Sequence, residues 1–300
     1  MIGIIAALTT ALCWALAARL YRQLSVSFTA LSLNFWKGLL SLMVLVPLGF
    51  FYGGKAVAVE HILWLLLSGA IGIGLGDTCF FLALTKIGDR LSLLVAETLA
   101  PILTALLAIA WLQEWLTAQQ WLAIAIILFA VDAVLRLQPT NYKASLASKK
   151  PKNLKALTEL SGISFAALAA LCQALGAVIS RDVLVNSQID PLSASSWRLL
   201  GGMALIIILM LCKRSRWLPQ ATTRLKPWLL LLVATLIGTT ASLYLQMVAF
   251  SHTKAAVVQT LLATSVILSL LLAKITKEPI PSGSWRWTVL ALAGVGLLLY

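Results

Sequence analysis

The sequence predicts an all-α membrane protein in which ten transmembrane helices form two inverted five-helix repeats. The first observation is composition: 61% of the residues are hydrophobic and only 11% are charged, whereas a soluble domain carries about 25% charged residues. The second is length, because the apolar runs reach about 20 residues, enough for a helix to cross roughly 30 Å of hydrocarbon. The third is an internal repeat with a shift of about half the chain.

The apolar runs define the predicted spans, and one polar segment separates them into two groups of five. The spans are predicted at 3–22, 29–51, 61–84, 91–112, 118–137, 161–183, 192–212, 227–249, 255–275 and 284–300. Gln138–Glu159 is rich in Lys, Ser, Asn and Pro, which is typical of a flexible linker. We therefore divide the chain into a first repeat at 1–137, a linker at 138–160 and a second repeat at 161–300. The first run lacks a basic n-region, so we interpret it as a helix rather than a signal peptide.

Matching motifs in the two halves support a duplication. ALCWALAA at 11–18 matches ALCQALGA at 170–177 with a shift of 159, and LSLNFWK at 31–37 matches LSASSWR at 192–198 with a shift of 161. Glu114 and Trp121 match Glu278 and Trp285 with a shift of 164. Shifts that grow slowly in unchanged order indicate one unit copied with small loop insertions. Because each unit has an odd number of crossings, the second copy enters the membrane from the opposite side, an arrangement from which many secondary transporters are built.

The chain is strongly basic, with a formal net charge of +13. Loops after the odd-numbered spans hold most of its Lys and Arg residues, whereas loops after the even-numbered spans hold Lys55, Arg181 and Lys254. By the positive-inside rule, this count favours odd loops in the cytoplasm and both termini outside. No segment is long enough for the basic folded surface that nucleic-acid binding needs, so we predict no nucleic-acid partner.

Two carboxylates inside the apolar spans of the first repeat are candidates for transport chemistry. A charged residue in a span is costly and usually faces a cavity or a partner. Glu97 lies one turn before Pro101, which is predicted to kink the helix, and Thr104 falls on the same face. We expect this face to line a cavity in which Glu97 binds an amine or a coupling proton; a protonated Glu bonded to a neighbouring helix is the structural alternative. Asp77 follows a Gly72–Gly76 spacing that permits close helix contact.

The other candidates are uncharged polar or aromatic residues, most of them in the second repeat. They are Trp14, Gln173, Ser180, Thr239, Ser242, Gln246 and Gln259. Gln173 occupies the position of Trp14 in the other repeat, and Thr239, Ser242 and Gln246 share one helix face. This set fits a binding site for a small polar solute. Interhelical hydrogen bonds of roughly 0.6 kcal/mol each are the alternative role for the hydroxyls and amides.

Several other polar residues are better explained by structure than by chemistry. Asp132 and Arg136 are spaced i,i+4 and predict a surface ion pair. Trp36 and Trp197, with the basic residue that follows each, are predicted to be membrane-interface anchors. Glu114 and Glu278 lie at helix ends, where we expect a structural role.

These motifs resemble the EamA-type members of the drug/metabolite transporter superfamily. The resemblance covers nearly the whole chain and rests on Trp36-Lys37 and Trp197-Arg198, on Pro101 with Glu114, and on a fifth span that opens near Trp121. The second copy departs from the pattern because Ser265 stands where Pro101 would fall. The resemblance implies ten helices, two repeats and transport of small metabolites, and it implies termini inside, opposite to the charge count.

We therefore predict a multi-pass cell-membrane transporter of a small organic metabolite, an exporter working by alternating access that is either facilitative or proton-coupled. A passive channel and a non-transporting scaffold or accessory subunit are the alternatives. An enzyme is not expected, since neither a GxxxxGK[ST] nor an HExxH motif occurs. With His61 and His252 as the only histidines, we expect no metal and no cofactor. The expected partners are the substrate, the lipid bilayer and possible second copies of the chain in a homodimer.

Overall fold

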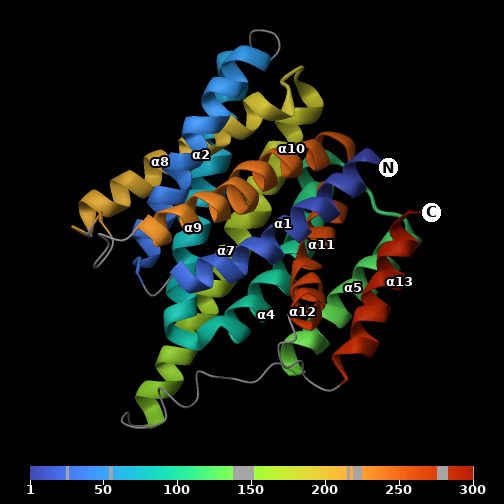
Figure 1. Ribbon diagram of the computed structural model, residues 1–300. Helices are drawn as coiled ribbons and strands as arrows, with labels where there is room; N and C mark the ends of the chain where they lie inside the picture. Colours follow the sequence, from blue (N-terminus) through green and yellow to red (C-terminus); the bar gives the residue numbers. More distant parts are fainter. Residues whose placement is uncertain are drawn as a thin grey trace.

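The computed structural model describes residues 1–24, 27–53, 57–137, 152–214, 217–218, 225–275 and 283–299, and the structural statements below concern these residues. Every secondary-structure element of these residues is a helix (Figure 1). The predicted linker lies largely outside the described residues, as does Glu278.

The first repeat folds into five spans. The third and fourth spans follow each other without a loop, so α4 contains the end of the third span and the whole of the fourth. Its elements are α1 (Ile2–Leu24), α2 (Ala30–Tyr52), α3 (Val59–Gly69), the π-helix η1 (Ala70–Gly76), α4 (Asp77–Leu112) and α5 (Ala118–Leu137). Gly88 has φ 79° and ψ 171°, so it ends the third span and lets the fourth begin at Leu91. A residue with a Cβ rarely adopts this backbone conformation, which explains the glycine.

The second repeat follows the same order of spans. Its elements are α7 (Lys152–Asn186), α8 (Pro191–Cys212), α9 (Leu225–Thr235), the π-helix η2 (Leu236–Ala241), α10 (Ser242–His252), α11 (Ala255–Ala263), α12 (Ser265–Ile275) and α13 (Ser284–Leu299). Within the described residues, nine spans are long and apolar enough to cross a membrane, and Ser284–Leu298 is a shorter apolar helix. The predicted fold class is confirmed. α7 begins earlier than the predicted start at 161.

Local sequence explains where some helices begin. The Asp190 carboxylate accepts hydrogen bonds from the backbone N–H groups of Leu192 and Ser193, both at 2.9 Å, at the start of α8. Pro191 follows as the first helical residue, where its missing N–H costs nothing. Thr29 caps α2 by accepting from the Ser32 N–H at 3.2 Å.

The third span of each repeat contains a π-helical segment at a matching place. η1 lies between α3 and α4, and η2 lies between α9 and α10. Wide turns of this kind are rare and occur often at functional sites. The residues that directly follow them, Asp77 and Ser242, are both candidates from the sequence.

The two repeats pack against each other along their length. α4 lies along α7, α1 along α10, and both α2 and α3 along α8. Glycines let α7 and η1 approach each other closely. A Cβ added to Gly176 would lie only 3.2 Å from the Gly72 Cα, so a larger residue would push the two helices apart. The predicted close helix contact at Gly72 and Gly76 is confirmed, since both glycines face α7.

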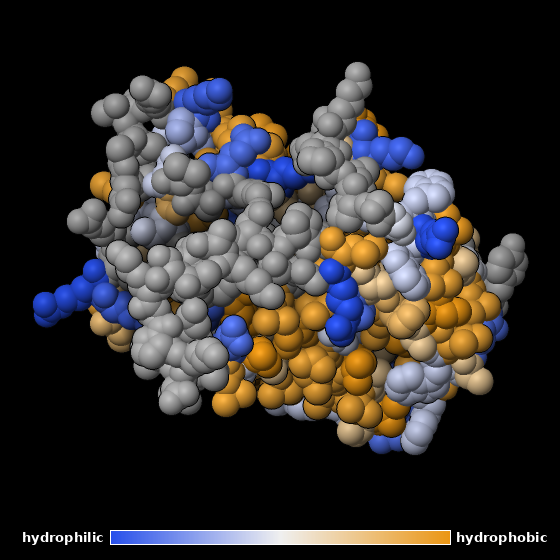
Figure 2. All heavy atoms as spheres, turned by 90° about the horizontal axis from the view of Figure 1, so that it is seen from below, coloured by the Kyte–Doolittle hydropathy of each residue, from blue (hydrophilic) through white to orange (hydrophobic). Residues whose placement is uncertain are grey.

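The outer surface carries many large apolar side chains. Figure 2 shows hydrophobic residues gathered over a broad area of one face, with hydrophilic residues at several places in and around it. Phe50, Phe51 and Phe129 are among the exposed side chains, as expected for a surface that faces lipid rather than water. The predicted surface ion pair is confirmed, with Arg136 Nε 2.6 Å from Asp132 Oδ2.

Candidate functional site

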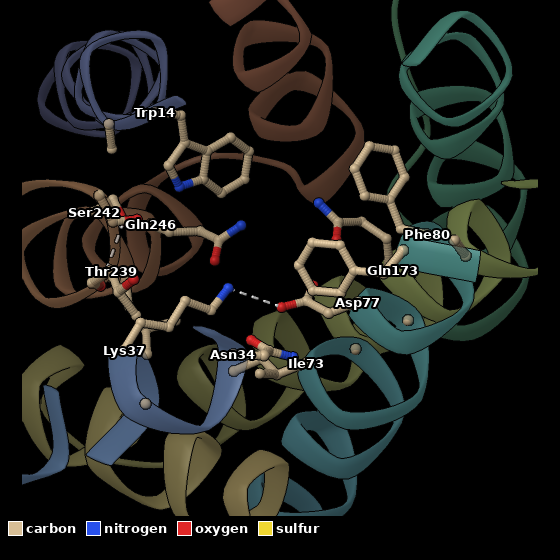
Figure 3. Close-up of a pocket in the computed structure, with 18 of the residues that line it drawn as sticks. Trp14, Asn34, Lys37, Ile73, Asp77, Phe80, Gln173, Thr239, Ser242 and Gln246 are labelled. Carbon is tan, nitrogen blue, oxygen red and sulfur yellow. Dashed lines mark hydrogen bonds and ion pairs between the residues drawn. The ribbon is translucent and has the colours of Figure 1, made fainter. Parts of the chain in front are cut away.

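A cavity of about 310 Å³ lies between the two repeats (Figure 3). The first repeat contributes side chains from α1, α2, η1 and α4, and the second from α7, α8, η2 and α10. Its charged and amide-bearing lining residues are Asn34, Lys37, Asp77, Glu97, Gln173, Arg198 and Gln246. Aromatic side chains complete the wall: Trp14, Tyr21, Phe80 and Phe81. Such a mixture of apolar walls with a few polar groups is typical of small-molecule sites.

An ion pair crosses the cavity between α2 and α4. Lys37 Nζ donates to Asp77 Oδ2 at 3.1 Å, and the two side chains are 18% and 31% exposed. Figure 3 shows both side chains extending toward each other from opposite walls. Asp77 was predicted from the sequence, and it lines the cavity together with its partner Lys37.

Arg198 is the counterpart of Lys37 in the second repeat, at the shift of 161 found in the sequence. It is only 4% exposed, and its Nη1 donates to Gln246 Oε1 at 3.2 Å. Its Nε is buried without a hydrogen-bond partner among the described residues. The prediction that the basic neighbours of Trp36 and Trp197 are interface anchors is wrong, because both Lys37 and Arg198 line the cavity.

Glu97 lines the cavity from α4. Its carboxyl group makes no hydrogen bond or ion pair with the described residues, so it is available to a ligand or a proton. The backbone stays helical at Pro101, and the non-helical conformation inside α4 is at Gly88; a bend at Pro101 stays a prediction. Thr104 is fully buried, and its hydroxyl donates to the Ala100 carbonyl at 2.7 Å, so it lies outside the cavity lining.

Five more predicted residues are brought together at the cavity. Trp14 and Gln173, which match in the repeat alignment, line it from α1 and α7. Thr239, Ser242 and Gln246 line it from η2 and α10. The Thr239 hydroxyl shares a 2.9 Å hydrogen bond with the Tyr21 hydroxyl, and the Ser242 hydroxyl donates to the Gly238 carbonyl at 2.7 Å.

Besides Thr104, two predicted residues lie away from the cavity. The Ser180 hydroxyl is bonded to the Ser68 hydroxyl at 2.7 Å, a contact between α7 and α3. Gln259 on α11 is 3% exposed and is not among the lining residues, although its Oε1 has no hydrogen-bond partner among the described residues. For Ser180, the interhelical hydrogen bond is the role that the geometry supports.

Sequence reasoning missed three charged or amide-bearing residues of the lining. Lys37 and Arg198 carried a usable signal, because a basic residue at the same place in both repeats indicates a role tied to the pseudo-twofold axis. Asn34 carried none. It is fully buried, and neither its amide nitrogen nor its amide oxygen has a hydrogen-bond partner among the described residues.

A second charge cluster joins the repeats at the end of the molecule where α4 stops. Arg181 Nε donates to Glu114 Oε1 at 2.7 Å and its Nη1 donates to the Phe250 carbonyl at 2.5 Å. Glu114 Oε2 accepts from the Ala255 backbone N–H at 2.9 Å, and Lys254 Nζ donates to the Trp115 carbonyl at 2.6 Å. We call this the end cluster. The cavity residues of α1 and α2 lie in the halves of these helices nearer the opposite, basic end.

Comparison with known proteins gives a family and a fold. The sequence profile of the EamA-like transporter family matches residues 1–135 and 160–300. A solved structure, described as "Crystal structure of protein", matches with a TM-score of 0.78 and 16% sequence identity, covering 99% of this chain and 96% of that chain. A comparison with curated proteins found no significant match.

At 16% sequence identity, the similarity to the solved structure shows the fold alone. The match extends over almost the whole of both chains. The family match is independent of it and falls on both repeats. Together with the apolar spans, these matches make the chain an integral membrane protein of the drug/metabolite transporter superfamily. The chain belongs to the EamA-like transporter family.

Proposed function

We propose that the protein is a secondary carrier that exports a small organic metabolite by alternating access. The observation that carries this proposal is the cavity between the repeats, to which both contribute charged side chains. A site placed between inverted repeats changes its exposure when one repeat moves against the other. A scaffold protein has no need for a Lys37–Asp77 pair and an unpaired carboxyl group inside the membrane.

The end cluster supplies one of the two closures that alternating access requires. It joins Glu114 of the first repeat to Arg181 and to the Ala255 N–H of the second, and the Trp115 carbonyl to Lys254. Breaking these contacts separates the repeats at this end and opens a route to the cavity between them. The arrangement supports a carrier over a permanently open pore, in which both ends would be free at once.

Export is the direction that we propose, and the charge distribution supplies the orientation used for it. The positive-inside rule assigns the basic end to the cytoplasm, and the cavity residues on α1 and α2 lie toward that end. In this orientation an exporter loads the site from the basic end and releases the substrate at the end cluster. Glu97, which has no partner among the described residues, is the residue proposed to carry a coupling proton.

Counterflow in proteoliposomes tests this function. The purified protein is first screened by thermal shift against amino acids, purines, amines and sugars, because a ligand that binds the folded state raises its stability. Radiolabelled forms of the same compounds are then offered to liposomes preloaded with excess unlabelled compound. A carrier produces saturable, transient accumulation of label. Non-saturable entry without counterflow contradicts the proposal in favour of a pore, and no flux of any compound favours a scaffold.

A further inference from the structure

We infer that the substrate of this cavity carries an oxyanion, a carboxylate in the simplest case, which binds to the guanidinium group of Arg198. The inference rests on the proposed carrier function and names the chemical class of its substrate. Its basis is an asymmetry between two equivalent cations, Lys37 and Arg198, of which only the first has an acidic partner bonded to it.

The two repeats treat their equivalent cations differently. Lys37 on α2 is bonded to Asp77, a carboxylate at the start of α4. Arg198 on α8 is bonded to Gln246, a neutral amide on α10. In both repeats the cation is hydrogen-bonded to a residue of the third span. In the second repeat this residue is neutral, so the cation lacks a bonded negative charge. The cavity lining therefore includes a buried guanidinium that has no carboxylate bonded to it among the described residues.

One edge of the Arg198 guanidinium is unused. Nη1 is engaged by Gln246, whereas Nε is buried without a partner among the described residues. Nε and Nη2 form the edge of the guanidinium that binds a carboxylate through two parallel hydrogen bonds. A buried donor without an acceptor costs free energy, so a site that retains one is suited to a ligand that supplies the acceptor.

Small residues create the space in which this guanidinium sits. A Cβ added to Gly72 would lie 3.2 Å from Arg198 Nη2, and one added to Gly176 would lie 3.4 Å from it. The group is held between η1 of the first repeat and α7 of the second, at the interface that alternating access must rearrange. An anion bound there contacts both repeats.

The remaining lining fits the rest of such a molecule. Asn34 has a free donor and a free acceptor at the cavity, which match a hydroxyl or an amide on the substrate. Phe80, Phe81 and Trp14 supply the apolar wall. The substrate class is therefore a small organic acid with an apolar body and one further polar group.

A thermal-shift titration of the purified protein tests the inference. The probe acids are benzoate, phenylacetate, 3-phenylpropanoate and hexanoate, together with a hydroxylated derivative of each. Each acid is compared with the amide and the amine that have the same carbon skeleton. We expect at least one acid to stabilise the protein with an affinity roughly ten- to a hundredfold above that of its amide, the ratio that a hydrogen bond to a charged group gives. If no acid is preferred over its amide, the inference is overturned.

Three variants assign the preference to this residue. Arg198→Gln removes the cation and is expected to abolish the preference for the acid. Gln246→Glu places a carboxylate beside Arg198, as in the Lys37–Asp77 pair. Because this carboxylate pairs with the guanidinium, the variant is expected to lose the preference for the acid while its charges stay paired. Arg136→Gln alters an arginine of an exposed ion pair on α5 and is expected to leave it unchanged. An acid preference that survives in Arg198→Gln or, if that variant does not fold, in Gln246→Glu overturns the assignment.

This result is separable from the carrier function. Stabilisation by amines that depends on Glu97, combined with saturable counterflow of an amine, overturns the anion inference and leaves the carrier standing. Acid-selective binding that depends on Arg198 without counterflow of that acid supports the anion site and contradicts the carrier on which its role as a substrate depends.

Discussion

Two of the four charged residues that line the cavity, Lys37 and Asp77, stabilise each other as an ion pair. Lys37 and Asp77 are each mostly buried, and their 3.1 Å contact offsets part of the cost of removing two charges from water. Asp77 and Lys37 lie on different helices, so their pairing also fixes α2 against the start of α4. Removing one partner leaves the other as an unpaired charge.

The pair predicts a specific pattern of stability changes. Asp77→Asn and Lys37→Met are each expected to lower the free energy of unfolding by about 1–3 kcal/mol, less than the 3–5 kcal/mol of a fully buried pair because both side chains are partly exposed. The double variant is expected to recover at least about 1 kcal/mol of the summed loss. Unfolding of the purified protein in detergent measures the cycle. Strict additivity of the two losses contradicts a direct interaction.

Glu97 is expected to govern the response of transport to pH. A step coupled to one proton changes by up to about tenfold per pH unit. If Glu97 holds that proton, Glu97→Gln is expected to reduce this dependence to about twofold or less across the same range, because an amide does not titrate. Initial rates in proteoliposomes at pH 6, 7 and 8 measure it.

The control for this prediction is Asp132→Asn, which alters a carboxylate of the exposed ion pair on α5. It is expected to keep the wild-type profile. A Glu97→Gln variant that transports with an unchanged pH profile removes Glu97 from proton coupling.

At the residue scale, the sequence predicted part of the cavity. Asp77 and Glu97 were identifiable because a carboxylate inside an apolar span is costly and needs a reason to be there. Thr104 and Ser180 show the limit of this reasoning, since their hydroxyls are bonded to helix backbone or to another hydroxyl. Uncharged polar residues serve helix contacts as readily as ligands, and the sequence does not distinguish the two.

At the scale of single elements, the π-helical segments and Gly88 shape the wall that carries Asp77. η1 and η2 interrupt the third span of each repeat beside the cavity. Neither was visible in the sequence, because a wide turn depends on packing against neighbouring helices rather than on a residue pattern. Gly88 was unremarkable in the sequence, since its positive φ arises only when the third and fourth spans are joined without a loop.

The backbone at Gly88 predicts a cost for any side chain there. At φ 79° and ψ 171°, Gly88→Ala is expected to lower the free energy of unfolding by about 1–3 kcal/mol. Gly296→Ala is the matched control, because nothing lies within 4 Å of a Cβ at that position on α13, and alanine is a better helix former than glycine. Thermal unfolding in detergent compares the two. An equally small effect of both substitutions contradicts the conformation at Gly88.

At the scale of the whole molecule, the duplication was the feature that the sequence predicted best. The apolar runs indicated ten spans, and three short matches with slowly growing shifts indicated that five of them are a copy of the other five. The odd number of crossings in each copy then implied the inversion. The functional asymmetry was not predictable in the same way. Lys37 is hydrogen-bonded to Asp77, whereas Arg198 is hydrogen-bonded to Gln246. The alignment of the repeats shows that the two cations are equivalent, but it does not predict which residue each one binds.

The inverted repeats, the shared cavity and the end cluster together make one claim, that the cavity is exposed to the two sides of the membrane in turn. Ala96 lines the cavity next to Glu97, so Ala96→Cys places a reporter there. The four natural cysteines are first replaced: Cys13, Cys79, Cys172 and Cys212. A membrane-impermeant maleimide is then applied to one side of sealed vesicles at a time, in the presence and absence of Glu114→Gln.

Glu114→Gln weakens the end cluster by removing the charge that binds Arg181. A shift of 1–2 kcal/mol changes the ratio of two states by roughly 5- to 30-fold. The account predicts labelling of position 96 from both sides, with Glu114→Gln raising the rate from the end-cluster side and lowering the rate from the basic side. Labelling from one side alone in both proteins, or an increase from both sides together, would contradict it.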